Sequence, residues 1–448
     1  MKPHSHSLLP AIALLGALSL AACSAQSVDA SLRLRIDLDR AVLPADSPDR
    51  AIVKICLDGL RLPRRELRRP VNLALVIDRS GSMSGEKIQK AKEAAREMLR
   101  HLSSDDIFSL VSFSTEVETL IPARPVGNGR AIERAIESIE ADGNTALFGG
   151  VSQGASELRK YCESNDGVNR IVLLSDGLAN VGPSSPEELG RLGAALVKEG
   201  ISVTTIGLGL DFNEDLMTRL AQRSDGNTYF VESSADLPRI FAAELGDVLD
   251  VVARRVVVEI EFPDWATPIG FVGREGVIRG RKAELSLNQL YGGQEKFALV
   301  EVEVTPPKSG VESEIARARV SYDDALTRRN ATLTATRSVQ FSRSRQAVIE
   351  SADQKVQADY ALNVIAVAKD KAVELVDSGR KEEAAQAMRQ KAAELRTMGE
   401  TYGNTSVLSV AQAVPAEAAK VESGGLDNEA RKSYRADSAQ TRNQQSSR

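Results

Sequence analysis

The stretch "LALVIDRSGSMSG", residues 73–85, decides the fold. Its first five residues are apolar without alternation, which is typical of a parallel strand buried on both faces. Asp78 stands where that strand should end, and Ser80 and Ser82 follow it on either side of Gly81. The pattern therefore predicts a buried strand whose carboxyl end presents one carboxylate and two hydroxyl groups.

The segments that follow this stretch alternate between apolar runs and amphipathic stretches. One helix has clear start and stop signals, with Ser185 as the cap, Pro186 in the first turn and Gly200 at the end. Alternation of this kind requires crossover connections, so it predicts a doubly wound α/β domain with a mostly parallel sheet over residues 70–252. Strands are expected within 106–114, 116–121, 169–177, 201–209 and 227–233, and helices within 85–102, 129–141, 146–162, 185–200, 213–226 and 234–252.

Both flanks of this domain have a different pattern. Residues 23–69 and 253–345 contain short strands of period two separated by Gly, Pro and Asp clusters, which predicts an antiparallel sheet or sandwich, and we expect both flanks to join one such unit. Residues 353–400 read as a helical hairpin with a stop at Ser378-Gly379. Residues 422–448 are polar, and we expect a disordered tail there.

The N-terminal segment has the shape of a secretory signal peptide over residues 1–22, with a lysine before a short apolar stretch. Its end, "LAAC" at 20–23, resembles the bacterial lipobox. That resemblance implies cleavage before Cys23, acyl chains such as palmitate on this residue, and anchoring to a membrane. Ser24 resembles the outer-membrane sorting pattern, so an outer-membrane lipoprotein is expected, facing either the periplasm or the exterior. An ordinary signal peptide with an incidental cysteine is the alternative.

Composition excludes several classes of function. Aromatic residues make up 4% of the 448 residues and the formal net charge is −5, which argues against a nucleic-acid partner. No glycine-rich loop has the pattern that cradles a nucleotide phosphate. His101 is the one histidine beyond the signal segment and no Gly-x-Ser-x-Gly is present, so we expect no enzymatic activity. The sequence does not decide whether Cys56 and Cys162 form a disulfide or remain two separate thiols.

Two more polar residues should reach the rim that carries Asp78. Thr145 precedes an apolar helix start in "DGNTALFGG", and Asp176 ends a strand in "IVLLSDG". Ligands of open α/β sheets bind beyond the carboxyl ends of the strands, where the strand order reverses. With Ser80 and Ser82 these residues provide two carboxylates and three hydroxyls, a set of hard oxygen donors that suits Mg²⁺.

The chain here resembles the von Willebrand factor A domain, and the five residues resemble its metal-ion-dependent adhesion site. The resemblance implies that Ser80, Ser82 and Thr145 hold Mg²⁺, with Ca²⁺ or Mn²⁺ as alternatives, while Asp78 and Asp176 bind it directly or through water. It also implies an open coordination position that an Asp or Glu of a partner protein fills. The flanks resemble those of secreted proteins related to inter-alpha-trypsin inhibitor heavy chains and calcium-activated chloride channel proteins.

Two functions compete. The first is a non-enzymatic adhesion or assembly module of the cell envelope, acting through the metal site. The second is an envelope scaffold that acts through its β and helical regions and keeps the metal site only as a structural or vestigial feature. Chelation separates them, because EDTA should abolish only binding through the metal. The helical stripe that could support a scaffold consists of Tyr360, Val364, Ala368, Val373 and Val376.

Overall fold

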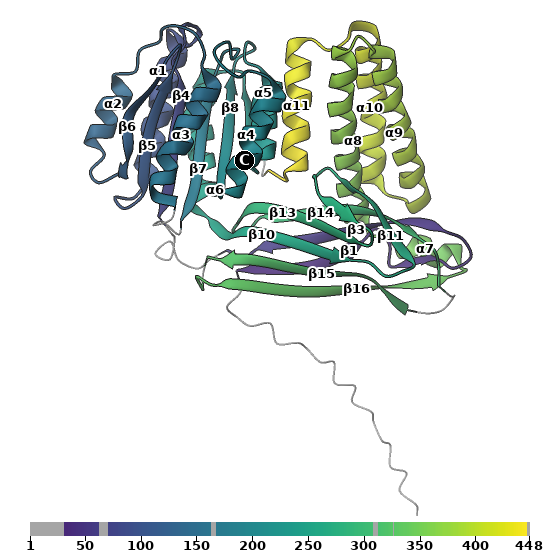
Figure 1. The fold of residues 1–448 in the computed structure, drawn as a ribbon. Coiled ribbons are helices and arrows are strands. Elements are labelled where there is room, and N and C mark those ends of the chain that lie inside the picture. Colours follow the sequence, from purple (N-terminus) through teal and green to yellow (C-terminus); the bar gives the residue numbers. More distant parts are fainter. Residues whose placement is uncertain (1–30, 62–69, 163–166, 308–311, 326, 446–448) are drawn as a thin grey trace, which may run out of the picture.

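The computed structural model describes residues 31–61, 70–162, 167–307, 312–325 and 327–445, which form an α/β domain, a β-sandwich and a helical unit (Figure 1). The predicted signal peptide at 1–22 and the predicted lipidated Cys23 lie outside the described residues. No helix in the described part of the chain combines the length and apolar composition that crossing a bilayer requires.

The α/β domain is built on a six-stranded sheet of order β6-β5-β4-β7-β8-β9. All neighbouring pairs are parallel except β5–β6, so β6 is an antiparallel edge strand. Every residue of strands β4, β7 and β8 is buried, which explains the continuous apolar runs Leu73–Ile77 of β4 and Ile171–Leu174 of β7. The strands are β4 (Val71–Asp78), β5 (Ile107–Phe113), β6 (Val117–Pro125), β7 (Val168–Ser175), β8 (Ile201–Leu208) and β9 (Thr228–Val231).

Helices cover both faces of this sheet. On one face Leu73, Leu75 and Ile77 of β4 pack with α1, α2 and α6, and on the other Ala74 and Val76 pack with α3, α4 and α5. The cap predicted at Ser185 forms a complete capping box with Glu188. The doubly wound fold is therefore confirmed. The helices are α1 (Glu86–His101), α2 (Arg130–Glu137), α3 (Leu147–Cys162), α4 (Pro186–Lys198), α5 (Glu214–Arg223) and α6 (Leu237–Leu249).

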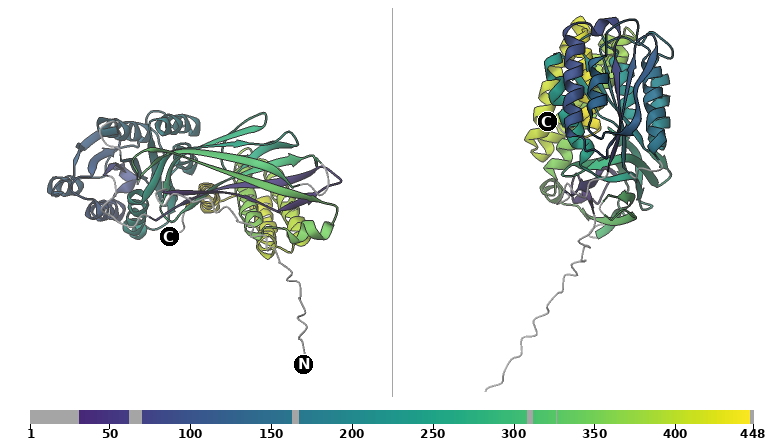
Figure 2. Two further views of the ribbon diagram at one scale, coloured as in Figure 1. Left: turned by 90° about the horizontal axis from the view of Figure 1, so that it is seen from below. Right: turned by 90° about the vertical axis from the view of Figure 1, so that its left-hand side faces the viewer.

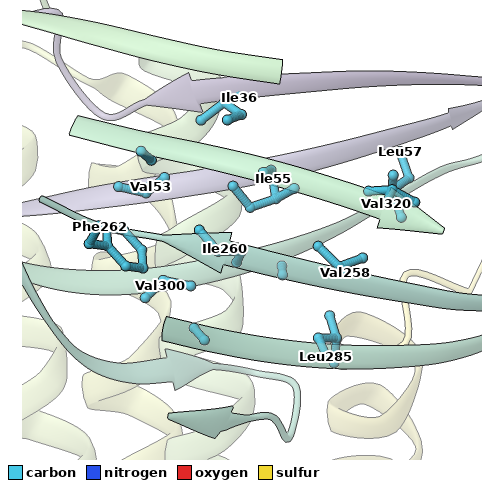
Figure 3. Close-up of a cluster of buried hydrophobic side chains, with 14 of the residues drawn as sticks. Ile36, Val53, Ile55, Leu57, Val258, Ile260, Phe262, Leu285, Val300 and Val320 are labelled. Carbon is cyan, nitrogen blue, oxygen red and sulfur yellow. The ribbon is translucent and has the colours of Figure 1, made fainter. Parts of the chain in front are cut away.

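The two flanks of the α/β domain combine into one sandwich. One sheet has the order β1-β3-β14-β11 and the other β12-β13-β10-β15-β16-β2, antiparallel except for β16–β2. Their apolar faces meet in a continuous core (Figure 3). The strands are β1 (Leu32–Leu38), β2 (Val42–Pro44), β3 (Asp49–Gly59), β10 (Val251–Glu261), β11 (Ala266–Val272), β12 (Val277–Arg279), β13 (Lys282–Tyr291), β14 (Glu295–Val304), β15 (Glu312–Asp324) and β16 (Asn330–Ser342).

The C-terminal part is larger and more ordered than the sequence suggested. The hairpin expected at 353–400 matches α8 and α9, but two further helices follow it, and the disordered tail expected at 422–448 is wrong because α11 occupies most of it. The helices are α7 (Arg345–Glu350), α8 (Gln354–Asp377), α9 (Lys381–Tyr402), α10 (Thr405–Gly424) and α11 (Asn428–Arg442).

Helix α11 is held by ion pairs, which explains why its polar composition misled the prediction. It lies between α5 of the α/β domain and α8 of the helical unit (Figure 1). Arg431 pairs with Glu214 of α5 and, at 2.6 Å, with Asp377 of α8. Arg435 contacts Asp215 of α5 at 2.7 Å. Charged residues that usually indicate solvation here join two parts of the molecule.

The sandwich lies against the amino end of the parallel sheet. Arg170, near the start of β7, is buried and donates hydrogen bonds to Gln289 at 2.8 Å and to Tyr291 of β13. Asn288 reaches Ser202 near the start of β8. The right-hand view of Figure 2 shows the sandwich below the α/β domain. The carboxyl ends of the strands, where the candidate site lies, therefore point away from the sandwich.

Candidate metal centre

The first part of the site is the turn that leaves β4. Asp78 is fully buried, and its carboxylate accepts hydrogen bonds from the backbone N–H of Ser80 at 2.8 Å and from the hydroxyl of Ser175 at 2.5 Å. Burial raises the pKa of Asp78; these hydrogen bonds oppose the shift, and the charge of Asp176 adds to it. A buried carboxylate beside a second one is electrostatically unfavourable, and a bound cation would relieve that cost.

The second part joins this turn to the end of β7. The hydroxyl of Ser82 donates to Asp176 at 2.6 Å and lies 3.1 Å from the hydroxyl of Ser80. Because Ser82 contacts both groups, the Ser80 hydroxyl lies within about 6 Å of the Asp176 carboxylate, a span that one octahedral ion with a bridging water covers. The residues predicted from 73–85 and from "IVLLSDG" are therefore neighbours in space.

Thr145 completes the group from the loop before α3. Its backbone N–H donates to the side chain of Asn180 at 2.8 Å, which ties this loop to the one after β7. A Cβ placed on Gly177 would lie 3.1 Å from the Thr145 hydroxyl, 3.4 Å from that of Ser82 and 3.6 Å from that of Ser80. The three hydroxyls thus surround one point, and glycine at 177 leaves that point open.

Sheet topology explains why these segments meet. Strands β4 and β7 are neighbours, and the chain leaves β4 toward β5 on one side and later returns to β7 on the other. The strand order reverses between β4 and β7, so the adjoining loops diverge and leave a crevice at the carboxyl edge. Asp78 ends β4 and Asp176 directly follows β7, which places both carboxylates at this crevice.

The donor set fits a hard divalent cation. Two carboxylates and three hydroxyls converge, and every donor is an oxygen, the ligand type that Mg²⁺ prefers. The described residues contain no group of three or more His, Cys, Asp or Glu side chains arranged to hold a metal. This crevice therefore depends on hydroxyl donors, a composition that leaves a bound cation strongly electrophilic.

Three residues of the site escaped the sequence analysis. Ser175 holds Asp78, Asn180 holds the Thr145 loop, and Lys87 of α1 lies with its ammonium 2.5 Å from the Asp176 carboxylate. Ser175 stands directly before Asp176, and Lys87 lies in the first helical turn after the serine-rich loop, so proximity to the motif was the available signal.

Arg79 and the two cysteines are placed as follows. The Arg79 guanidinium is 4.0 Å from Glu118 of β6. Cys56 lies on β3 and Cys162 ends α3. No disulfide joins these two described cysteines.

Residues 72–243 match the family model of the von Willebrand factor type A domain. The α/β unit is a von Willebrand factor A (VWA) domain. Among curated proteins, the chain is 28% identical over 267 residues to protein sll0103 of Synechocystis sp., a match covering 57% of this chain and 62% of that one. It is 29% identical over 239 residues to inter-alpha-trypsin inhibitor heavy chain H3 of Homo sapiens, covering 49% of this chain and 26% of that one. The chain spans less than two thirds of each.

Solved structures show how far the fold likeness extends beyond the VWA domain. The von Willebrand factor type A protein from Catenulispora acidiphila aligns with a TM-score of 0.64 at 17% identity, covering 82% of this chain and 89% of that one. The ArnB paralog VWA2 from Sulfolobus acidocaldarius aligns with a TM-score of 0.60 at 18% identity, covering 92% and 98%. The likeness therefore includes parts of the fold outside the VWA domain.

Proposed function

We propose that this protein is a non-enzymatic protein-binding module of the bacterial cell envelope, which captures a carboxylate of its partner through a Mg²⁺-dependent site in the VWA domain. VWA domains commonly mediate interactions between proteins, which supports the general class. The observation that carries the proposal is the convergence of five oxygen-bearing side chains at the switch point of the sheet: Asp78, Ser80, Ser82, Thr145 and Asp176.

Each residue has a distinct task in this proposal. Ser80, Ser82 and Thr145 would hold the ion, and Asp78 and Asp176 would balance its charge directly or through water. The ion would supply a positive charge with an open position for an incoming carboxylate. Ser175 fixes the Asp78 carboxylate at 2.5 Å, so that the donors stay oriented before a partner arrives.

The proposed place of the protein is the outer membrane, through a lipid anchor on Cys23. The "LAAC" segment at 20–23 and Ser24 support it. Metabolic labelling with an alkyne fatty acid should mark the wild-type protein and leave Cys23→Ala unlabelled. Equal labelling of the two proteins would contradict the anchor.

Affinity capture from envelope extract tests the binding function. We expect the wild-type protein to retain a partner in Mg²⁺ and to release it in EDTA, and Ser80→Ala to retain none. Ser104→Ala is the matched control, because Ser104 is an exposed serine at the opposite end of the same domain. Capture by Ser80→Ala at wild-type strength, or capture that persists in EDTA, would refute the metal bridge.

The scaffold alternative has lost its main support. Of the stripe that suggested a helical docking face, Ala368 and Val373 are buried, and Tyr360, Val364 and Val376 pack against the core of the helical unit. These side chains stabilise the bundle, so that stripe offers no docking surface.

A further inference from the structure

Two leucines of the VWA domain are highly exposed. Over the described residues of this domain, Leu178 at 59% and Leu210 at 44% are the large apolar side chains with the greatest exposure. Single exposed leucines are ordinary on protein surfaces. Both of these, however, lie on loops that follow adjacent strands, β7 and β8, at the carboxyl edge that carries the candidate metal site.

Leu178 is linked to the site through its neighbour. It follows Gly177, which lies against the hydroxyls of Thr145, Ser82 and Ser80. It is also two residues from Asp176, so the two Cα atoms are at most about 7 Å apart. The next residue, Ala179, is partly buried and packs against the core. The Leu178 side chain is therefore exposed at the rim, while the backbone next to it is fixed by the packing of Ala179.

Leu210 borders the site from the β8–α5 loop. Leu208 and Phe212, two residues to each side, are buried at 1% and 4% exposure, so the loop is packed while Leu210 is not. A Cβ on the adjacent Gly209 would lie 3.8 Å from the Lys87 ammonium, and that ammonium contacts Asp176 at 2.5 Å. Leu210 thus follows a glycine that lies beside Lys87, and Lys87 contacts the proposed metal ligand Asp176.

We infer that the partner presents its Asp or Glu next to a bulky apolar residue, which packs on Leu178 and Leu210 while the carboxylate reaches the cation. This inference rests on the proposed function. A carboxylate on a solvated cation provides little discrimination between partners, since acidic residues are common on surfaces. Apolar contact beside the charged anchor adds affinity in proportion to the area removed from water. The rim has the composition of an interface in which an anchor is flanked by apolar contacts.

Two short peptides test this inference on the full chain. One is blocked Gly-Gly-Asp-Gly-Gly and the other blocked Gly-Leu-Asp-Gly-Gly, and their binding is followed by the relaxation of peptide protons near Mn²⁺ at the site. The wild-type protein should bind the leucine peptide about tenfold more tightly, the effect of burying much of one leucine side chain.

The variants assign this preference to the two leucines. In the double variant Leu178→Ser, Leu210→Ser the preference should fall below about twofold, with binding of the glycine peptide and of Mn²⁺ unchanged. Leu362→Ser is the matched control, because Leu362 is a similarly exposed leucine on α8, and it should keep the full preference.

The outcomes separate the inference from the function on which it rests. Manganese-dependent binding of both peptides with equal affinity, or a preference that survives in the double variant, would overturn the inference and leave the proposed function standing. Binding of neither peptide, or binding that EDTA does not reduce, would overturn both.

Discussion

At the scale of single residues, the proposed metal site depends on the absence of one methyl group. A Cβ at position 177 would lie 3.1 Å from the Thr145 hydroxyl and close to the hydroxyls of Ser82 and Ser80, in the space that these three groups border. We expect Gly177→Ala to displace Thr145 and to lower cation affinity about tenfold or more, as changes that misorient ligands do. Isothermal titration with Mn²⁺ measures the change.

Gly270→Ala is the matched control for this substitution, because no atom lies within 4 Å of a Cβ built there. Its cation affinity should equal that of the wild-type protein. Unchanged cation affinity in Gly177→Ala would show that the ion does not bind between the hydroxyls next to Gly177.

Lys87 provides a second test at this scale. Its ammonium lies 2.5 Å from Asp176 and would repel a cation that uses the same carboxylate. Removing that charge in Lys87→Met should raise Mn²⁺ affinity by at least about three- to tenfold, the size expected for two charges about 4 Å apart that are screened as strongly as in bulk water. Lys90→Met is the control, since Lys90 pairs with Glu93 instead. Equal or weaker binding in Lys87→Met would contradict the prediction.

The sequence predicted the donor residues of the site but not their supporting residues. Asp78 and Asp176 were recognisable because each ends an apolar run, and parallel strands bring their carboxyl ends to one edge. Ser175 and Lys87 carry no such signal, because a serine inside a strand and a lysine in a helical turn are ordinary. Their roles depend on side-chain directions that only the folded structure fixes.

At the scale of elements, the sandwich and α8 are joined by a charged cluster centred on Glu295 of β14. Its carboxylate lies 2.8 Å from Lys54 of β3 and 2.9 Å from Lys355 of α8. Burial alone would raise the pKa of Glu295, but the hydrogen bonds from Lys54 and Lys355 lower it to about 2. Glu295 contributes to the contact between sheet and helix only while its carboxylate is ionised, whereas Lys54 also pairs with Asp359 of α8 at 2.7 Å.

The pH dependence of stability follows from this lowered pKa. The contribution of Glu295 should be complete above its ordinary pKa of 4.5 and disappear as the pH falls toward 2. Its size is at most roughly 3 kcal/mol, from about 1.4 kcal/mol per pKa unit. Glu295→Gln should therefore unfold more easily in urea at pH 7 and match the wild-type protein near pH 2. Glu303→Gln, at an exposed position of the same strand, should show no such trend.

Elements differed in how well their patterns predicted them. Strand β4 was clear because its apolar run has no polar interruption, and helix α1 was clear because its apolar residues follow the helical period and lie against one core. Helix α11 was missed because Arg431, Lys432 and Arg435 pair with acidic residues more than fifty positions away. The composition of a short segment does not indicate which distant residues its charged side chains will pair with.

At the scale of the molecule, α11 connects the VWA domain to the helical unit. Arg435 lies 2.7 Å from Asp215 of α5 and 3.1 Å from Asp370 of α8, and all three side chains are largely buried. Arg435→Ala would leave two carboxylates without this partner, at a cost of about 3 kcal/mol. We expect faster hydrogen exchange over α11 while cation affinity is retained.

Arg396→Ala is the control for this variant, because the pair of Arg396 with Glu400 is exposed and should contribute little. Exchange over α11 at the wild-type rate in Arg435→Ala would show that packing, rather than charge, holds the helix in place.

The shared sandwich has a consequence for the order in which the parts of the chain fold. Strand β3 pairs with β14, so Asp49 finds its partner only in Val304. The VWA domain lies between these strands in the sequence as one continuous segment. The sheet of the VWA domain contains no strand from either flank, so this domain can fold before the sandwich is complete. Until then Val53 and Ile55, buried in the finished sandwich, face water. The sandwich therefore forms only after its two flanks have met across the VWA domain, and an incomplete chain exposes the apolar face of β3.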